Sequence, residues 1–222
     1  ATFAAIKKLP NLKIAHLIDQ DNWYDYKFNI NYEFFNTALE NLVLNQQYDL
    51  TVISYVLNEC AENLIKKGLT HAWEKTKNYL IILEPGTPHG YHSFLRSRDI
   101  LIGQGAYLIA PCPHEQECPL KNPDWCHFKT RIQRTNLHKN IKAGSKAFED
   151  ESYIYGIFSK RPPSIREDRI IKKPRKRSHH ILFEFCTTDG IKQKIVSYKN
   201  KDTYYKAKKW EWGDGVILTN ED

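Results

Sequence analysis

Methionine is absent from this 222-residue sequence, position 1 included, and so is any long apolar run. A membrane-spanning helix needs roughly 18 consecutive apolar residues, whereas runs such as 79–83 and 106–110 are far shorter. We therefore expect a soluble protein with no membrane partner. Because a helix-like stretch already begins at Ala1, we expect the natural N-terminus to lie further upstream. The lack of a targeting segment then excludes no compartment.

Closely spaced cysteine pairs are also lacking. Five Cys occur, an odd number, and three lie within fifteen residues of one another. This pattern does not fit the disulfide framework of a small secreted domain, so a reducing compartment fits better. The sequence contains no C-x₂₋₄-C pair, which is the usual unit of a structural zinc site.

Acidic residues are in the minority. The chain has 33 Lys and Arg against 26 Asp and Glu, with a net charge of +7 and a pI near 9.0. Such a balance favours a polyanionic partner, and nucleic acid before membrane. With 41% hydrophobic residues, the chain is nevertheless expected to bury a full core and to be globular.

Residues 1–110 alternate short apolar runs with amphipathic stretches, which is typical of β/α units around a parallel sheet. The predicted strands are 13–18, 49–55, 79–83 and 107–110. The predicted helices are 1–9, 32–44, 61–77 and 91–102, with Gly103 and Gly105 as stops after the last. The predicted fold class is α/β, with half or more of a doubly wound sheet.

The chain is predicted to divide into three regions. Residues 1–110 form the partial α/β domain, and 111–150 form a cysteine-rich insertion without apolar period, which something other than a core must order. Residues 151–222 hold a last strand at 152–158, a linker at 160–177 that is too charged to pack, and a C-terminal β region. There, 180–187 and 192–198 flank Asp189-Gly190, which predicts a β-hairpin.

Cys112, Cys118 and Cys126 lie in the cysteine-rich insertion, and Cys186 lies on the predicted hairpin. Four thiolates complete the coordination of one zinc ion or cap the four irons of a cubane cluster. Free Cys is usually buried, but a loop poor in apolar residues offers no core to enter. The loose spacing, held open by prolines at 111, 113 and 119, favours an iron–sulfur cluster, and zinc stays an alternative.

Three further residues lie near this pattern. Cys60 follows an apolar run and is predicted to be a packed small residue. His114 and His127 adjoin ligand positions, where either could replace a cysteine or bond to a sulfur. Both are equally consistent with partly exposed loop histidines.

Several motifs are longer and more specific. They are LEPGTP at 83–88, APCPH at 110–114, CPL at 118–120, DWCHF at 124–128, FEDE at 148–151, the hairpin at 180–190 and WGD at 212–214. Together they resemble the methyltransferase-like proteins of the small ribosomal subunit, from about residue 14 to the end of the chain.

The resemblance implies a class I methyltransferase-like, Rossmann-type sheet with an inserted [4Fe–4S] site, whose carried-over ligands are Cys112, Cys118, Cys126 and Cys186. It also implies the small ribosomal subunit and rRNA as partners, in assembly or translation, and leaves catalysis open. The host compartment would be a bacterial cytoplasm or a mitochondrial matrix. The glycine-rich turn that holds S-adenosylmethionine in such folds would precede Ala1, so we expect an N-terminally truncated sheet and cofactor binding only in a full-length protein.

Three residues are candidates for cofactor binding. Asp19 ends the first predicted strand, where an acidic residue of such folds accepts hydrogen bonds from ribose hydroxyls, and Asp21 is the next choice. Asn58 and Glu59 follow the strand at 49–55 and could line the methyl-donor pocket. Helix caps and solvated positions are the structural alternatives, and no residue is identified as a catalytic base or nucleophile.

RNA binding is predicted at one basic stretch, where five charges could neutralise phosphates: Lys172, Lys173, Arg175, Lys176 and Arg177. Arg131, Arg134, His138, Lys139 and Lys142 are expected to flank it near the metal loop. The aromatic residues Tyr204, Tyr205, Trp210 and Trp212 could stack on bases, or could form a small C-terminal core.

Three functional hypotheses follow. The first is a ribosome assembly or binding factor that keeps the fold and the cluster without turnover. The second is an active S-adenosylmethionine-dependent rRNA methyltransferase. The third is an RNA-binding regulator that uses the cluster as a redox switch.

Overall fold

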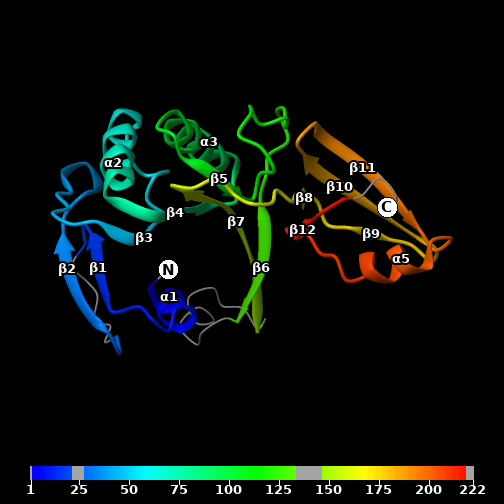
Figure 1. Ribbon diagram of the computed structural model, residues 1–222, viewed down its shortest axis with the longest axis horizontal. Helices are drawn as coiled ribbons and strands as arrows, with labels where there is room; N and C mark the ends of the chain where they lie inside the picture. Colours follow the sequence, from blue (N-terminus) through cyan, green and yellow to red (C-terminus); the bar gives the residue numbers. More distant parts are fainter. Residues whose placement is uncertain (1, 22–27, 134–146, 219–222) are drawn as a thin grey trace.

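The computed structural model describes residues 2–21, 28–133 and 147–218, and these form one two-stranded and two five-stranded sheets. Figure 1 shows the main sheet between α2 and α3 on one side and α1 (Thr2–Lys8) on the other, with the C-terminal sheet beside it. Each five-stranded sheet has its own hydrophobic core. Within the described residues, no helix combines the length and apolar character that crossing a bilayer requires.

The main sheet is mixed. β3 (Tyr48–Ser54) pairs in parallel with β4 (Thr76–Pro85). β7 (Phe148–Ser159) lies antiparallel between β4 and β5 (Tyr107–Ala110). β5 therefore runs in the same direction as β3 and β4. The predicted strands at 49–55, 79–83, 107–110 and 152–158 are confirmed, and the α/β class with them.

Two helices cover one face of this sheet. α2 (Glu62–Lys75) and α3 (Pro88–Gly103) match the helices predicted at 61–77 and 91–102. The N-terminus of α3 is fixed by the Thr87 side chain, which accepts from the Gly90 amide at 3.1 Å, and by Pro88 in the first turn. After the helix, Gly105 adopts a φ of 81° that most side chains avoid.

The helix predicted at 32–44 is wrong. Residues 31–36 instead form β2 (Asn31–Asn36), which pairs in parallel with β1 (Ile14–Asp19), and only η1 (Leu39–Asn41), a single 3₁₀ turn, follows. Three of the four residues at 32–35 are aromatic and have strong strand propensity. The six-residue ladder with β1 therefore prevails over the helical period. Residues 32–44 therefore supply no α-helix to cover the face of the main sheet opposite α2 and α3.

The C-terminal sheet contains the predicted hairpin, β10 (His180–Thr187) and β11 (Gly190–Ser197), which turns at Gly190 with a φ of 111°. β8 (Asp168–Ile170), β9 (Arg175–Lys176) and β12 (Gly215–Val216) complete it, and α5 (Lys201–Ala207) packs against it. The prediction that 160–177 is too charged to pack is wrong. Ile170 and Ile171 are 0% and 3% exposed because β8 pairs with β10 inside the sheet.

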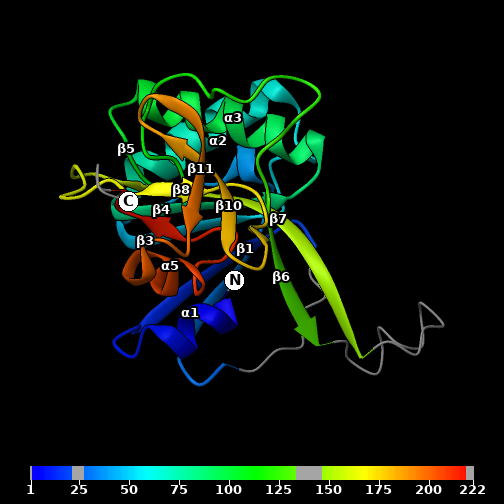
Figure 2. The ribbon, with the colours of Figure 1, turned by 90° about the vertical axis from the view of Figure 1, so that its right-hand side faces the viewer.

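A two-stranded arm extends from the main sheet. β6 (Phe128–Gln133) pairs with the first half of β7 and projects away from the body (Figure 2). The insertion predicted to have no apolar period therefore contains a strand. Arg131 pairs with Asp150 at 2.8 Å on this arm. The other predicted basic residues of this cluster lie outside the described residues: Arg134, His138, Lys139 and Lys142.

Candidate metal centre

Four cysteines converge where the two five-stranded sheets meet. Three lie in the connection between β5 and β6, here called the cysteine loop (residues 111–127), and Cys186 lies near the end of β10. The pKa of the Cys126 thiol is raised well above its usual value, first by burial and then by its neighbours Cys112, Cys118 and Cys186. Two sequence segments far apart along the chain therefore bring four thiols within electrostatic reach of one another.

The thiols lie in a poorly solvated environment. Burial is the largest cause that raises the pKa of Cys112 to about 11 and that of Cys186 to about 12. The nearby Arg98 guanidinium lowers both values, and Arg169 also lowers that of Cys112. Lys172 acts in the same direction on Cys126. The site thus combines buried groups that can become anionic with surrounding fixed cations.

Arginine side chains help to order the cysteine loop, in which Cys112 and Cys126 also pack against the core of the main sheet. Arg98 on α3 is 2% exposed and donates from Nη2 to the carbonyl oxygens of His114 at 3.3 Å and Gln116 at 2.5 Å. Arg169 on β8 is 9% exposed and donates from Nε to the carbonyl oxygen of Pro111 at 3.0 Å. The carbonyl groups of Pro111, His114 and Gln116, which flank Cys112 and precede Cys118, therefore accept hydrogen bonds from Arg98 and Arg169.

Arg166 adds a third clamp at the start of the same loop. It donates to the carbonyl oxygens of Leu108 and Pro113, both at 3.4 Å, and pairs with Glu115 at 2.7 Å. Glu115 in turn accepts from the Leu108 amide at 3.0 Å. Charge-assisted hydrogen bonds are among the strongest in proteins, so these contacts contribute to ordering the segment. The prediction that the cysteines have no core to enter is wrong for Cys112 and Cys126, which pack against the core of the main sheet.

Polar groups from the surrounding elements reach the sulfurs. The Tyr91 hydroxyl on α3 donates to Cys118 Sγ at 3.2 Å. Burial is the largest cause that raises the pKa of Tyr91, and the Cys118 thiol raises it further. His114 Nε2 lies 3.9 Å from Cys186 Sγ, and burial lowers the pKa of His114. His114 is 7% exposed, so the alternative of a partly exposed loop histidine is wrong for this residue.

His127 lies on the other side of the cysteine loop. Its ring stacks on Trp125 at 5.3 Å and meets the Trp212 ring edge-on at 5.0 Å. It is half-buried, and burial lowers its pKa. The Trp125 indole donates to the carbonyl oxygen of Gly86 at 3.0 Å, so the residue before Cys126 is fastened to the turn after β4.

Buried polar atoms without hydrogen-bond partners gather around these thiols. They are Arg98 Nε, His114 Nδ1 and Trp212 Nε1. Such groups carry a free-energy cost in an apolar interior unless something pairs with them. Among the described residues, no group of three or more His, Cys, Asp or Glu side chains is arranged to hold a metal ion. The thiols therefore share one region without closing around a single point.

Cys60 behaves as predicted for a packed small residue. It is half-buried after β3 and packs against the core of the main sheet.

The predicted cofactor residues lie at the carboxyl ends of parallel strands. Asp19 ends β1, and its side chain accepts from the Asp21 amide at 3.0 Å. Asn58 and Glu59 follow β3. The Asn58 amide donates to Glu84 at 3.3 Å, its side-chain oxygen is buried without a partner, and Glu59 is exposed. No described contact joins Asp19 to Asn58, so a shared cofactor site stays a prediction.

Glu84 at the end of β4 braces this edge. It is 0% exposed and also accepts from the amides of Val56 at 3.2 Å and Leu57 at 3.0 Å. Burial raises the pKa of Glu84, and the backbone hydrogen bonds oppose that rise. The carboxylate therefore acts as a structural brace for the turn after β3.

The five basic residues predicted to bind RNA divide into two kinds. Lys172 pairs with Asp124 at 2.5 Å, and Lys176 donates to the carbonyl oxygen of Lys208 at 2.7 Å. Lys173, Arg175 and Arg177 are exposed. Lys172 thus ties the basic stretch to the cysteine loop, Lys176 bonds to the end of α5, and the other three lie on the surface.

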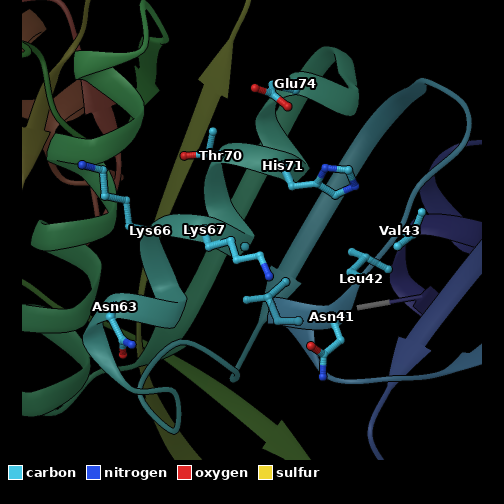
Figure 3. A pocket seen from close by; sticks show the side chains of 11 residues that line it. Asn41, Leu42, Val43, Asn63, Lys66, Lys67, Thr70, His71 and Glu74 are labelled. Carbon is cyan, nitrogen blue, oxygen red and sulfur yellow. The ribbon is translucent and has the colours of Figure 1, made fainter.

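Two surface hollows lie near different parts of the fold. One, of about 800 Å³, lies between η1 and α2 and is lined by Val43, Lys67 and His71 among others (Figure 3). The other, of about 370 Å³, lies beside the cysteine loop and is lined by His114, Arg166 and four further residues. None of the predicted cofactor residues lines either hollow.

Sequence reasoning missed Arg98, Arg166, Arg169 and Tyr91. Arg98 falls on the buried face of α3, seven residues after Tyr91, and Arg169 precedes two buried isoleucines. A lone arginine within an otherwise apolar pattern is the signal that could have found two of them, because Arg is almost never fully buried without a partner.

The fold and site thus define an α/β protein with a mixed main sheet and four thiols at its junction with a second sheet. The chain belongs to the family described as mitochondrial small ribosomal subunit Rsm22, whose model matches residues 10–217. The predicted resemblance to a methyltransferase-like family of the small ribosomal subunit is confirmed.

Curated relatives include the mitochondrial ribosome assembly protein METTL17 of Homo sapiens. The chain is 26% identical to it over 183 residues, which cover 76% of the chain and 39% of that protein. It is 22% identical over 215 residues to the mitochondrial Rsm22-cox11 tandem proteins 1 and 2 of Schizosaccharomyces pombe, covering 75% of the chain and 29% of each relative. The chain therefore spans less than half the length of these relatives.

Among solved structures, a chain from Thermoplasma acidophilum that is provisionally named a methyltransferase gives a TM-score of 0.44 at 10% identity. The match covers 72% of this chain and 63% of that one. A similarity of this size does not establish a shared fold.

Proposed function

We propose that this chain is part of a protein that assists assembly of the small ribosomal subunit, contacts ribosomal RNA, and holds a [4Fe–4S] cluster on Cys112, Cys118, Cys126 and Cys186. The observation that carries the ribosomal part is the family match over residues 10–217, together with a relative named as a ribosome assembly protein. The mitochondrial names of the relatives favour the mitochondrial matrix over a bacterial cytoplasm. In the same proposal, the main sheet and its helices are a methyltransferase-like domain.

The residues at the four-thiol site fit a cluster. Four thiolates can each bind a different iron of a cubane cluster, and the loose spacing of the three cysteines in the cysteine loop suits that wider arrangement. Arg98, Arg169 and Lys172 lie beside the thiols and would offset the negative charge of four buried thiolates. Zinc is the alternative.

The position of the site gives the cluster a structural role. Three ligands belong to the cysteine loop of the main sheet, and Cys186 belongs to the C-terminal sheet that carries the basic stretch. When bound, the cluster would supply a cross-link between these two units and a one-electron redox couple. The chain's own clamps would keep the loop in place around it.

Ribosome binding can be tested by co-sedimentation with purified small-subunit precursors and with large subunits. We expect binding to the small-subunit particles, weakened at least tenfold when Lys173, Arg175 and Arg177 are changed to Ser, because each exposed cation contributes to phosphate binding. A matched variant changes three exposed lysines elsewhere, Lys13, Lys66 and Lys67. Equal binding to both subunits, or equal loss in the two variants, would contradict the proposal.

An active S-adenosylmethionine-dependent rRNA methyltransferase is the second candidate. The observation that favours it is the buried, unpartnered side-chain oxygen of Asn58 at the carboxyl edge of β3, because ligands of open α/β sheets bind at this edge. Transfer of a labelled methyl group from S-adenosylmethionine to small-subunit rRNA by a full-length protein, abolished by Asn58→Ala, would support it. No transfer by an intact full-length protein would sink it.

A further inference from the structure

An exposed aromatic and basic surface lies at the end of the C-terminal sheet opposite the four thiols. It is here called the aromatic corner and consists of Arg177, His179, Tyr198, Lys199, Lys201 and Tyr205. β10 starts at His180, beside this corner, and runs to Thr187, one residue beyond Cys186. Figure 1 shows β9, β10 and β11 meeting α5 at this end.

Buried contacts hold the aromatic corner in shape. Tyr204 is 6% exposed, packs in the second core, and its hydroxyl donates to the carbonyl oxygen of Ser178 at 3.4 Å. The Tyr198 ring meets Tyr204 edge-on at 5.4 Å, and the Tyr198 amide donates to the carbonyl oxygen of His179 at 2.8 Å. The strand ends and the helix are thus fixed relative to one another.

Two rings of the corner are left toward solvent. Tyr205 is 53% exposed, next to Tyr204 on α5, and His179 is exposed at the start of the hairpin. Both contact Tyr198, at 6.1 Å and 6.0 Å between ring centroids. A rigid, half-exposed ring offers a stacking surface whose conformational entropy is already largely lost, which lowers the cost of binding a base.

Positive charge surrounds these rings. Arg177, Lys199 and Lys201 are exposed, and Lys201 Nζ lies 5.8 Å from the Tyr198 ring centroid. Asp202 is the exposed acid beside them. Residues 172–218 contain twelve Lys and Arg against five Asp and Glu, so this quarter of the chain has the same net charge, +7, as the whole. The partner that matches such a surface is a polyanion.

We propose that the aromatic corner binds single-stranded RNA, with an unpaired base stacked on Tyr205 and neighbouring phosphates paired with Arg177, Lys199 and Lys201. This inference rests on the proposed ribosomal function and specifies the kind of RNA. Stacking on a protein ring requires a base face that is free, and a duplex keeps its base faces covered. The corner therefore favours single-stranded loops over paired helices.

Of the four aromatic residues predicted to stack on bases, the proposal keeps only Tyr205. Tyr204 and Trp210 pack in or against the second core, and Trp212 packs against the first. Tyr205 is the member of that set with an exposed ring.

The test uses the metal-loaded chain, purified without oxygen, and a fluorescein-labelled 12-nucleotide RNA of mixed sequence, single-stranded or annealed to its complement. Stacking contributes about 1–3 kcal/mol per base. We therefore expect Tyr205→Ala to weaken single-strand binding about tenfold, and Tyr205→Phe to restore it because the ring is kept. Tyr107→Ala, on β5 with an exposure of 38%, is the matched control and should bind as wild type does.

Mapping with 4-thiouridine-labelled RNA provides a second measurement if the alanine variant does not fold. We expect crosslinks in the peptides that contain His179 and Tyr205. Three outcomes would overturn the stacking role but leave the proposed function standing. They are unchanged binding in Tyr205→Ala, tighter binding of wild type to the duplex than to the single strand, and crosslinks in other peptides. No RNA binding and no small-subunit binding by wild type would overturn both.

Discussion

The guanidinium of Arg98 donates to the carbonyl oxygen of Gln116 across 2.5 Å, and thereby ties the buried face of α3 to the cysteine loop just ahead of Cys118. Together with Arg166 and Arg169, it holds carbonyl groups of a loop that contains few apolar residues. The loop is consequently stabilised by a few charged contacts, which makes it sensitive to single substitutions.

Arg98→Met should destabilise the chain strongly. It removes the buried donors to the carbonyl groups of His114 and Gln116, and hydrogen bonds to charged groups contribute about 1.5–3 kcal/mol each. We expect a loss of at least about 2 kcal/mol in chemical denaturation, together with lower metal retention. Arg96→Met, on the same helix but with its side chain 41% exposed, is the control and should change stability by about 0.5 kcal/mol or less. Similar losses in the two variants would refute the clamping role.

If the proposed cluster is bound, Tyr91→Phe should retain it and change its reduction potential. The lost hydroxyl donates to Cys118 Sγ at 3.2 Å, and hydrogen bonds to cluster sulfurs raise reduction potentials. We expect full iron content and a more negative potential in a redox titration followed by electron paramagnetic resonance. Tyr153→Phe, which removes a hydroxyl from β7, is the control. An unchanged potential in Tyr91→Phe would count against a bond to a ligand sulfur.

Glu84→Gln should change how stability depends on pH. Burial raises the folded-state pKa of Glu84, so the folded chain binds this proton more tightly than the unfolded chain does. Stability is therefore lost as pH rises from the ordinary carboxyl pKa of about 4.3 through the raised value. Gln cannot ionise, so the Tm of wild type minus the Tm of Glu84→Gln should fall as pH rises from 5 to 8. Glu59→Gln, at an exposed position, should show no such trend. A rise of this Tm difference with pH for Glu84→Gln would contradict the raised pKa.

Gly86→Ala should lower the Tm. A Cβ at Gly86 would lie 2.6 Å from backbone atoms of Ser152 and Tyr153, and these atoms belong to β7 and cannot move alone. Overpacking of this kind costs about 1–3 kcal/mol. Gly103→Ala, where a Cβ meets nothing within 4 Å, is the control and should be neutral or slightly stabilising. Equal Tm values for Gly86→Ala and wild type would show that the turn after β4 is looser than described.

The sequence predicts much of the fold because the strands of the main sheet are short apolar runs bounded by turn residues. The hairpin is predictable for the same kind of reason, since Gly190 permits the φ of 111° that its turn requires. The helix predicted at 32–44 fails because its apolar spacing is compatible with two elements, and pairing with β1 decides between them. Such long-range pairing leaves no mark in a local pattern.

The sequence indicates which four cysteines form the candidate site but not which groups support them. Clustered cysteines in a loop poor in apolar residues, with Cys186 on the predicted hairpin, suggest metal binding, which stays a prediction. The guanidinium groups that hold the loop come from α3 and β8, and a sequence does not state which carbonyl groups a distant arginine will meet. Likewise, the division of the basic stretch into two structural and three surface cations depends on Asp124 and on the Lys208 carbonyl group.

The most direct test of the central claim is the metal content of the chain purified without oxygen, with Cys126→Ser and Cys60→Ser for comparison. The account predicts about four irons and four sulfides per chain in wild type and in Cys60→Ser. It also predicts a broad visible absorption band at the blue edge that is lost in Cys126→Ser. One zinc per chain and no visible absorption band would show that the four cysteines bind zinc and not an iron–sulfur cluster. No metal in wild type would contradict the claim that the four cysteines hold a metal centre.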